Sequence, residues 1–120
     1  MAIIGTHALL YTSEPEAVRT LLRDVFEFSS VDAGGGWLIF ALPPAEVGVH
    51  PAEGPTAEAG TVHQLSFMCD DIGATVAELR AKGVEVRGEP EDHGWGIVTA
   101  IALPGGGELG LYQPLHPTAI

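Results

Sequence analysis

Two histidines stand at matching places in two similar stretches of the chain, and their side chains are the first candidates for chemistry. His7 ends the tripeptide Gly5-Thr6-His7, and His63 ends Thr61-Val62-His63 in the second half. An imidazole can bind a divalent metal ion, or it can be a polar core group with a hydrogen-bond partner. The matching positions strengthen the case for metal binding and leave both interpretations open.

The match between the two halves continues along the chain and indicates an internal repeat. Three more pairs of segments correspond in the same order: Gly36-Trp37 with Gly94-Trp95, Leu42-Pro43 with Leu103-Pro104, and Glu46-Val47-Gly48-Val49 with Glu108-Leu109-Gly110-Leu111. Between the copies, PAEGPTAEAG (residues 51–60) has no apolar period and is typical of a linker. We therefore expect a first module in residues 1–51, a linker in 52–60, and a second module with a tail in 61–120.

Each half predicts one amphipathic helix. In the first half, Ser13 and Glu16 fit a capping box, and an apolar stripe follows at helical spacing: Val18, Leu21, Leu22, Val25 and Phe26. In the second half, Asp70 or Asp71 caps a helix that ends at Lys82-Gly83, with Ile72, Val76 and Leu79 on one face.

One predicted strand precedes each helix and three follow it. The predicted strands span residues 3–12, 27–31, 37–42 and 46–50 in the first half, and 62–68, 84–87, 95–103 and 108–112 in the second. One helix covers only one face of a four-stranded sheet. We therefore expect the two uncovered faces to meet and enclose a space.

This order of elements resembles the vicinal oxygen chelate superfamily, which includes glyoxalase I, extradiol dioxygenases and bleomycin- and fosfomycin-resistance proteins. The resemblance runs from His7 to Pro114. The resemblance rests on His7, His63, the Cys69-Asp70-Asp71 segment before the second helix, and the closing LPGGGELGLYQP, residues 103–114. It implies an α+β fold in which two tandem βαβββ modules form a concave eight-stranded sheet.

The resemblance also implies a metal centre in which His7 and His63 are joined by a carboxylate. Such a set, with open positions for the oxygens of a substrate, suits Fe, Mn, Ni or Zn as the divalent ion. Glu108 is the candidate carboxylate and the candidate catalytic residue.

The carboxylate position departs from the family pattern. Aligned without gaps, the family's metal-binding Glu falls on Gly110, and its first-module counterpart falls on Gly48. Glu108 and Glu46 stand two residues earlier on the same strand face, a displacement of roughly 6.6 Å. Either the glycine run 105–107 shifts the strand and brings Glu108 to the metal, or the site has lost its carboxylate. His50, on the face of Gly48, could be a third imidazole.

Period-two counting predicts the lining of a small-molecule pocket on the face opposite the helices. Counting from His7, His63 and Glu108 places Leu9, Tyr11, Leu65, Phe67 and Tyr112 on that face. Core packing is the alternative for each of them. The candidate substrate-binding residues are Tyr11, Trp37, Glu46, His50, Phe67, Trp95 and Tyr112. His93 lies in an insertion beside Trp95 and is either a lid residue or an ordinary loop residue, and His116 is expected in the tail.

The composition limits the possible partners. There are 16 Asp and Glu against 5 Lys and Arg, a net charge of -11, which disfavours nucleic acid and anionic membranes and favours a neutral or cationic ligand. The single Cys69 excludes an intrachain disulfide. The N-terminal residues lack the basic and apolar regions of a secretory signal, so we expect a cytoplasmic protein.

Two functions from different classes follow from these residues. The first is a metal-dependent lyase, isomerase or dioxygenase in which His7, His63 and Glu108 hold the ion. The second is a metal-free drug-binding protein of the bleomycin-resistance type. Because each module leaves an edge strand and the resembling proteins are typically dimers, we expect a homodimer. In it, His7 of one chain would share a pocket with His63 and Glu108 of the other.

Overall fold

The computed structural model describes residues 7–46, 48–49, 54–58, 60 and 63–120. Its centre is a four-stranded sheet in the order β3 (Ser66–Met68), β6 (Glu108–Pro114), β5 (Gly96–Ala102) and β4 (Glu91–Asp92). β3 runs parallel to β6, and the other pairs are antiparallel. The predicted strand at 84–87 also runs beside β5: Val86 bridges to Ile101, and the Arg87 amide donates to the Ala100 carbonyl at 2.8 Å.

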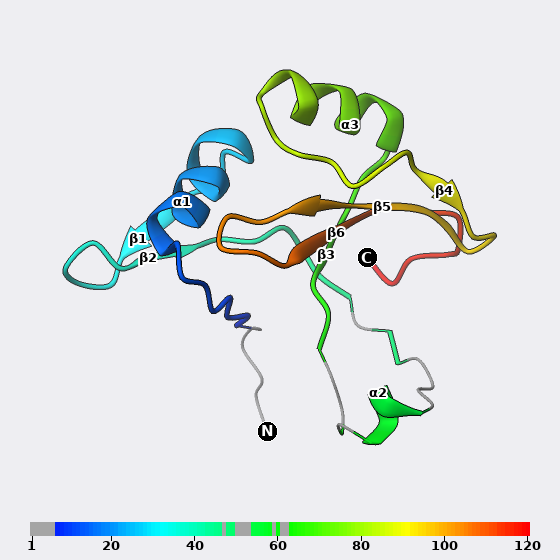
Figure 1. The fold of residues 1–120 in the computed structure, drawn as a ribbon, viewed down its shortest axis with the longest axis horizontal. Helices are drawn as coiled ribbons and strands as arrows, with labels where there is room; N and C mark the ends of the chain where they lie inside the picture. Colours follow the sequence, from blue (N-terminus) through cyan, green and yellow to red (C-terminus); the bar gives the residue numbers. More distant parts are fainter. Residues whose placement is uncertain (1–6, 47, 50–53, 59, 61–62) are drawn as a thin grey trace.

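Helix α3 (Ile72–Ala81) covers one face of this sheet (Figure 1). Its N-terminus is capped by Asp71, whose side chain accepts from the Ala74 amide at 3.1 Å, and by Gln113 of β6, whose Oε1 accepts from the Ile72 amide at 3.0 Å. The helix ends at Lys82, followed by Gly83 with a φ of 83°. The predicted helix, its cap and its end are therefore confirmed.

The core lies between α3 and the sheet. Ile101, Leu109 and Leu111 are almost fully buried, and they pack with Ile72, Val76 and Leu79 of the helix. Because side chains alternate along a strand, Glu108, Gly110 and Tyr112 point to the other side. We call that side the open face.

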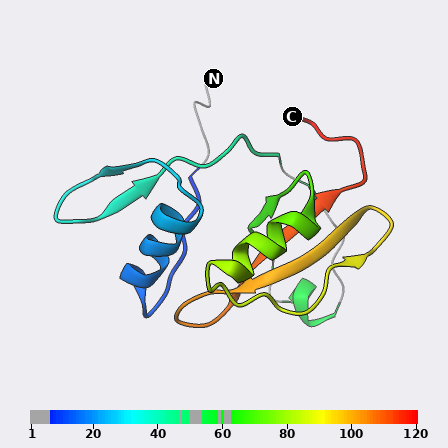
Figure 2. The same ribbon diagram turned by 90° about the horizontal axis from the view of Figure 1, so that it is seen from above.

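The first half contributes helix α1 (Pro15–Thr20), a π-helical turn η1 (Leu21–Val25) and the antiparallel pair β1 (Ser30–Asp32) and β2 (Leu38–Phe40). Val18 and Leu21 are buried, and Leu21 joins the core of the second half, so the predicted stripe is confirmed. Both longer helices lie on the same side of the strands (Figures 1 and 2).

The predicted capping box at Ser13 is wrong. α1 begins at Pro15, with Glu14 as its N-cap. Proline favours the first helical position because its φ is already helical and its missing amide needs no partner there. The Thr12 hydroxyl instead accepts from the Glu14 amide at 3.1 Å and donates to the Pro104 carbonyl at 3.0 Å. The second of these hydrogen bonds attaches the segment before α1 to the second half of the chain.

A continuous eight-stranded sheet is absent from the described part of the chain, whose strands form one two-stranded and one four-stranded sheet. The described parts of two predicted strands, residues 7–12 and 46 with 48–49, are irregular. β1 is exposed along its length, and a lone two-stranded ribbon offers little support to further strands. The predicted linker contains a four-residue helix, α2 (Pro55–Glu58). Among the described residues, no helix is both long and apolar enough to cross a membrane.

Candidate functional site

The open face of the four-stranded sheet is built from alternate residues of three strands. Tyr112 pairs with Val98 on one side and with Met68 on the other. Gly110 pairs in the same way with Ala100 and Ser66. The middle of the face therefore carries small side chains, and the end near Tyr112 carries larger ones.

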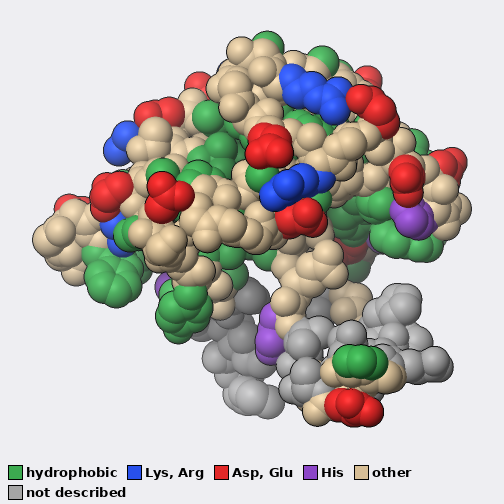
Figure 3. All heavy atoms as spheres, in the orientation of Figure 1, with side chains coloured by type: hydrophobic (Ala, Val, Ile, Leu, Met, Phe, Trp, Pro, Cys, Tyr) green, Lys and Arg blue, Asp and Glu red, His purple; other side chains and the backbone are tan. Residues whose placement is uncertain are grey.

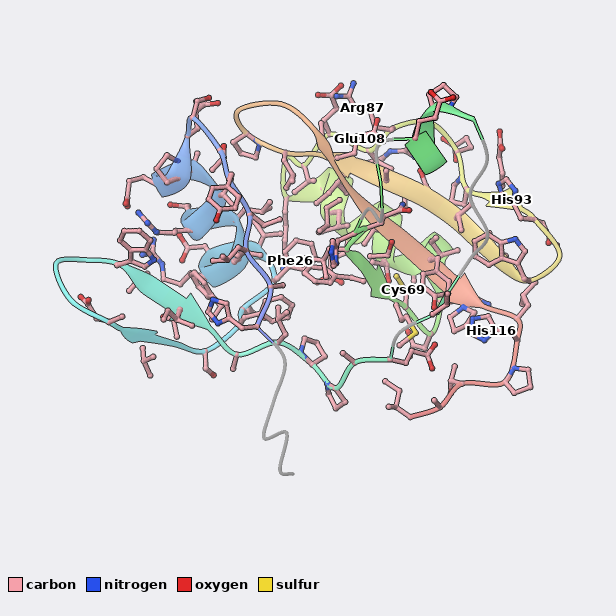
Figure 4. All side chains as sticks on the ribbon, turned by 90° about the horizontal axis from the view of Figure 1, so that it is seen from below. Phe26, Cys69, Arg87, His93, Glu108 and His116 are labelled. Carbon is pink, nitrogen blue, oxygen red and sulfur yellow. The ribbon has the colours of Figure 1, made fainter. Side chains whose placement is uncertain are left out.

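Four rings form a continuous aromatic row at that end: His93, Trp95, Tyr112 and His116. Successive ring centroids lie 5.9, 6.0 and 6.0 Å apart, within the range of favourable aromatic contacts. Figure 4 shows His93 and His116 at the same end of the sheet. Trp95 stays about half exposed, at 53%. The row therefore offers ring surface to solvent.

Gly96 makes room for the central ring of this row. A Cβ at position 96 would lie 3.3 Å from Cδ2 of Tyr112 and 3.3 Å from the Gln113 carbonyl oxygen. Those separations are tighter than ordinary van der Waals contact, so a side chain here would press on the Tyr112 ring. The Gly94-Trp95-Gly96 segment thus supplies one ring and leaves space for the next.

A carboxylate from the first half reaches the aromatic row. The Tyr112 hydroxyl donates to Glu46 Oε1 at 3.5 Å, and the Ala119 amide donates to Glu46 Oε2 at 2.7 Å. Burial raises the pKa of Tyr112 above its ordinary value, and the negative charge of Glu46 and their hydrogen bond raise it further. The phenol therefore stays protonated and remains a hydrogen-bond donor to Glu46.

Glu108, the predicted catalytic carboxylate, lies at the other end of the sheet. It pairs with Ala102, and its Oε1 lies 3.5 Å from Nε of Arg87. Its position on β6 is four residues from Tyr112, about 13 Å along the strand. Figure 4 shows Glu108 and Arg87 together, away from His93 and His116. The aromatic row and Glu108 are therefore separate sites.

A single chain does not assemble a metal site among its described residues, and a site shared between two chains remains a prediction. Within the described residues of one chain, no three His, Cys, Asp or Glu side chains come close enough to hold a metal ion, so His7, His63 and Glu108 are not brought together. His7 and His63 are both exposed. The histidines visible in Figure 3 lie apart from one another. His50, the predicted third imidazole, lies outside the described residues.

Gly110, where the family pattern expects a carboxylate ligand, has no space for a side chain. A Cβ there would collide with Oγ of Ser66 on β3. The strand pairing therefore favours a small residue at this position, and a glutamate would require the Ser66 side chain to move. This steric reason supports the interpretation that the carboxylate has been lost from this position.

Phe67 lies on the helix side of the sheet, and its predicted place on the open face is wrong. It pairs with the buried Leu111, and its ring makes edge contacts with Phe26 at 5.2 Å and Phe28 at 5.4 Å. Leu65 also packs against the core. The counting failed because it began at His63, which lies outside β3.

Of the other predicted pocket residues, some come together on the open face and others lie exposed elsewhere. Trp95, Tyr112 and Glu46 come together as described. Tyr11 is exposed in the irregular segment before α1, and Trp37 lies at the hairpin between β1 and β2, 64% exposed, with the Arg19 guanidinium 5.9 Å from its ring centroid. His93 was expected to be either a lid residue or an ordinary loop residue, and His116 was expected to be a tail residue. The even spacing of 112, 114 and 116 was the signal that His116 could share the face of Tyr112.

Comparisons with known proteins agree with this architecture. The family model described as "Glyoxalase/Bleomycin resistance protein/Dioxygenase superfamily" matches residues 6–107. A comparison with the curated proteins finds no match.

Solved structures with this fold include proteins of several activities. TnmS3, an antibiotic binding protein from Streptomyces sp. CB03234, is 27% identical, with a TM-score of 0.66 over 95% of this chain and 98% of that one. A lactoylglutathione lyase from Agrobacterium tumefaciens is 22% identical, with a TM-score of 0.61 over 93% and 92% of the two chains. The fosfomycin resistance protein FosX from Mesorhizobium loti is 14% identical, with a TM-score of 0.55 over 99% and 96%.

Proposed function

Because this chain belongs to the glyoxalase/bleomycin resistance protein/dioxygenase superfamily, we propose that it is a binding protein for a small organic molecule. The ligand would lie on the open face of the four-stranded sheet, against Trp95 and Tyr112 of the aromatic row. The observation that carries the proposal is the convergence of Trp95, Tyr112 and Glu46, two rings from the second half and a carboxylate from the first. The antibiotic-binding activity of TnmS3, at 27% identity, supports a binding role.

The chemistry of the site favours a flat ligand that carries positive charge or N–H donors. Aromatic side chains stack on planar rings and attract cations through their negative faces. Glu46 adds an acceptor with a full negative charge at the edge of Tyr112. The net charge of -11 repels anions in general and attracts cations. An anion of the same shape should therefore bind more weakly.

A metal-dependent reaction at His7 and His63 is the rival proposal. It is favoured by the repeat positions of the two histidines and by the likeness of the fold to a lactoylglutathione lyase. The ion pair of Glu108 with Arg87 counts against Glu108 as the third ligand. Binding against Trp95, Tyr112 and Glu46 leaves the Glu108–Arg87 pair intact and is the simpler proposal.

Fluorescence titration with proflavine, a flat tricyclic cation with amino groups, tests the binding proposal. We expect proflavine to bind the wild-type protein more tightly than anthracene-9-carboxylate, a flat tricyclic anion. Trp95→Ala should weaken proflavine binding about tenfold or more, since a central ring in a contact contributes at least ~1.4 kcal/mol. Glu46→Gln should weaken proflavine binding and, because it removes a negative charge, should not weaken the binding of the anion.

Trp37→Ala is the matched control, because it removes the other tryptophan, an exposed one outside the aromatic row. Equal losses in Trp37→Ala and Trp95→Ala would contradict the proposed site. Elemental analysis of protein purified without added metal or chelator distinguishes the metal-dependent function from metal-free binding. About one ion per site, lost in the His7→Ala, His63→Ala double variant, would favour the metal-dependent function.

A further inference from the structure

The last residues of the chain turn back over the aromatic row. We call residues 115–120 the C-terminal strap. It starts at Leu115, whose amide donates to the Trp95 carbonyl at 2.9 Å. His116 then lies over Tyr112 at 6.0 Å between centroids, with the ring planes 30° apart. Further on, the Ala119 amide donates to Glu46 at 2.7 Å. In Figure 1 the tail turns back toward the middle of the molecule after β6.

The strap contacts the same two groups that a ligand on this face would use. His116 covers ring surface of Tyr112, and the Ala119 amide takes one oxygen of the Glu46 carboxylate. A flat cation with N–H donors offers both contacts at once: a ring for Tyr112 and a donor for Glu46. The strap thus makes the same two contacts, with Tyr112 and with Glu46, that the proposed ligand would make.

We propose that the C-terminal strap is an internal competitor that must move aside when the ligand binds to Tyr112 and Glu46. This inference rests on the proposed binding function and adds a regulation to that same site. The apparent affinity is then the intrinsic affinity multiplied by the fraction of molecules in which the strap is open.

The spacing of the rings requires this movement. A ring that stacks on both Tyr112 and His116 must lie about 3.5 Å from each, so the two would have to stand about 7 Å apart. They stand 6.0 Å apart. A flat ligand therefore has to displace His116 before it can stack on that face of Tyr112.

The strap is also attached in a way that permits displacement. Residues 117–120 are exposed, and Ile120 is 56% exposed. The hydrogen bond from Leu115 to Trp95 lies at the root of the strap and does not involve Tyr112 or Glu46. The strap can therefore swing outward from Leu115 while β6 and the aromatic rings of the sheet stay in place.

Two substitutions release the strap without altering the groups that the ligand uses. Ala119→Pro removes the amide that donates to Glu46, since proline has no N–H. Ala119→Ser keeps that amide and is the matched control. His116→Ala removes the ring over Tyr112. The probe is proflavine, titrated into each full-length variant and followed by fluorescence.

We expect Ala119→Pro and His116→Ala each to bind proflavine about threefold more tightly than wild type, and the double variant about tenfold, with Ala119→Ser unchanged. In wild type, the amide proton of Ala119 should show the NMR shift of a strong hydrogen bond, which should be smaller in Glu46→Gln, where the acceptor is neutral, and lost on adding proflavine. If wild type binds proflavine and the released variants bind it equally or more weakly, the competition is wrong, and weaker binding in His116→Ala would make His116 part of the site. If wild type and released variants all fail to bind, the proposed function fails first.

Discussion

At the scale of single residues, the pair of Tyr112 and Glu46 joins the two halves of the chain. Their side chains meet across a sequence separation of 66 residues, and the proposed binding site depends on that contact. Burial, followed by the charge and hydrogen bond of Glu46, raises the pKa of Tyr112. The raised pKa belongs to the folded state, so the ionisation of Tyr112 should change the stability of the protein at alkaline pH.

The first prediction concerns this titration. An unfolded tyrosine ionises near a pKa of about 10, so at lower pH both states hold the neutral phenol and this group changes nothing. Between that value and the raised folded pKa, only the unfolded chain ionises, so the free energy of unfolding falls as pH rises. Glu46→Gln should lower the folded pKa of Tyr112, so the fall begins at the same pH, ends at a lower pH and is smaller in total.

Ultraviolet absorbance of tyrosinate measures the titration directly. The difference between the titrations of wild type and Tyr112→Phe gives the titration of Tyr112 without that of Tyr11, the other tyrosine of the chain. An unchanged Tyr112 titration in Glu46→Gln would mean that the carboxylate does not contact the phenol in solution.

At the scale of elements, the parallel pairing of β3 with β6 decides what the open face can carry. Ser66 stands directly against Gly110, and the absence of a side chain at 110 lets the two strands approach. A family carboxylate at this place would require the Ser66 side chain of β3 to move. The register of the β3–β6 pair therefore disfavours a metal-binding carboxylate at position 110, a question that the sequence pattern alone left open.

The second prediction is that Gly110→Ala destabilises the protein by about 1–3 kcal/mol, the usual cost of an added group in a tight place. In a Ser66→Gly background most of that cost should vanish, because the new Cβ then meets only the Cα of residue 66, at 3.5 Å. Urea unfolding of the two single variants and the double variant measures the coupling.

Gly48→Ala is the matched control, since Gly48 is the repeat counterpart of Gly110 and the described structure leaves open space around its Cβ position. It should be nearly neutral. Additive costs for Gly110→Ala and Ser66→Gly would show that the two residues are not in contact.

At the scale of the whole molecule, the first half leaves much apolar surface uncovered. The radius of gyration is 15.5 Å, against about 14 Å expected for a compact chain of this length. A depression of about 260 Å³ beside the β1–β2 pair is lined mainly by apolar atoms of residues 29–31 and 39–41. Other large apolar side chains are exposed in the same half: Leu9, Tyr11, Val31, Trp37 and Val49. A second copy of the chain is the partner that we expect to cover them.

The third prediction is therefore a homodimer in analytical ultracentrifugation at micromolar concentration. Val31→Glu, which places a charge on the exposed apolar surface of β1, should shift the protein toward the monomer because the charge would be buried in the interface. Ala77→Glu, on the exposed side of α3, is the matched control and should leave the assembly unchanged. A monomeric wild type would contradict the homodimer.

Local patterns in the sequence were sufficient for three elements of the second half, α3, β5 and β6. The stripe of Ile72, Val76 and Leu79, the Asp71 cap and the stop at Lys82-Gly83 predicted α3, because each signal depends on residues within a few positions of one another. The strands at 95–103 and 108–112 were predicted closely for the same reason, and the repeat pointed to the family before any contact was known.

Tertiary contacts decided the site. Phe67 faces the core because β3 takes its register from Leu111, and no local pattern contains that pairing. Glu46 and His116 meet Tyr112 only because the first half and the strap fold back over the end of β6. Glu108 pairs with Arg87 because the strand at 84–87 lies beside β5. The sequence by itself determined the family and the elements α3, β5 and β6, whereas contacts between residues distant in sequence determined which side chains form the proposed site.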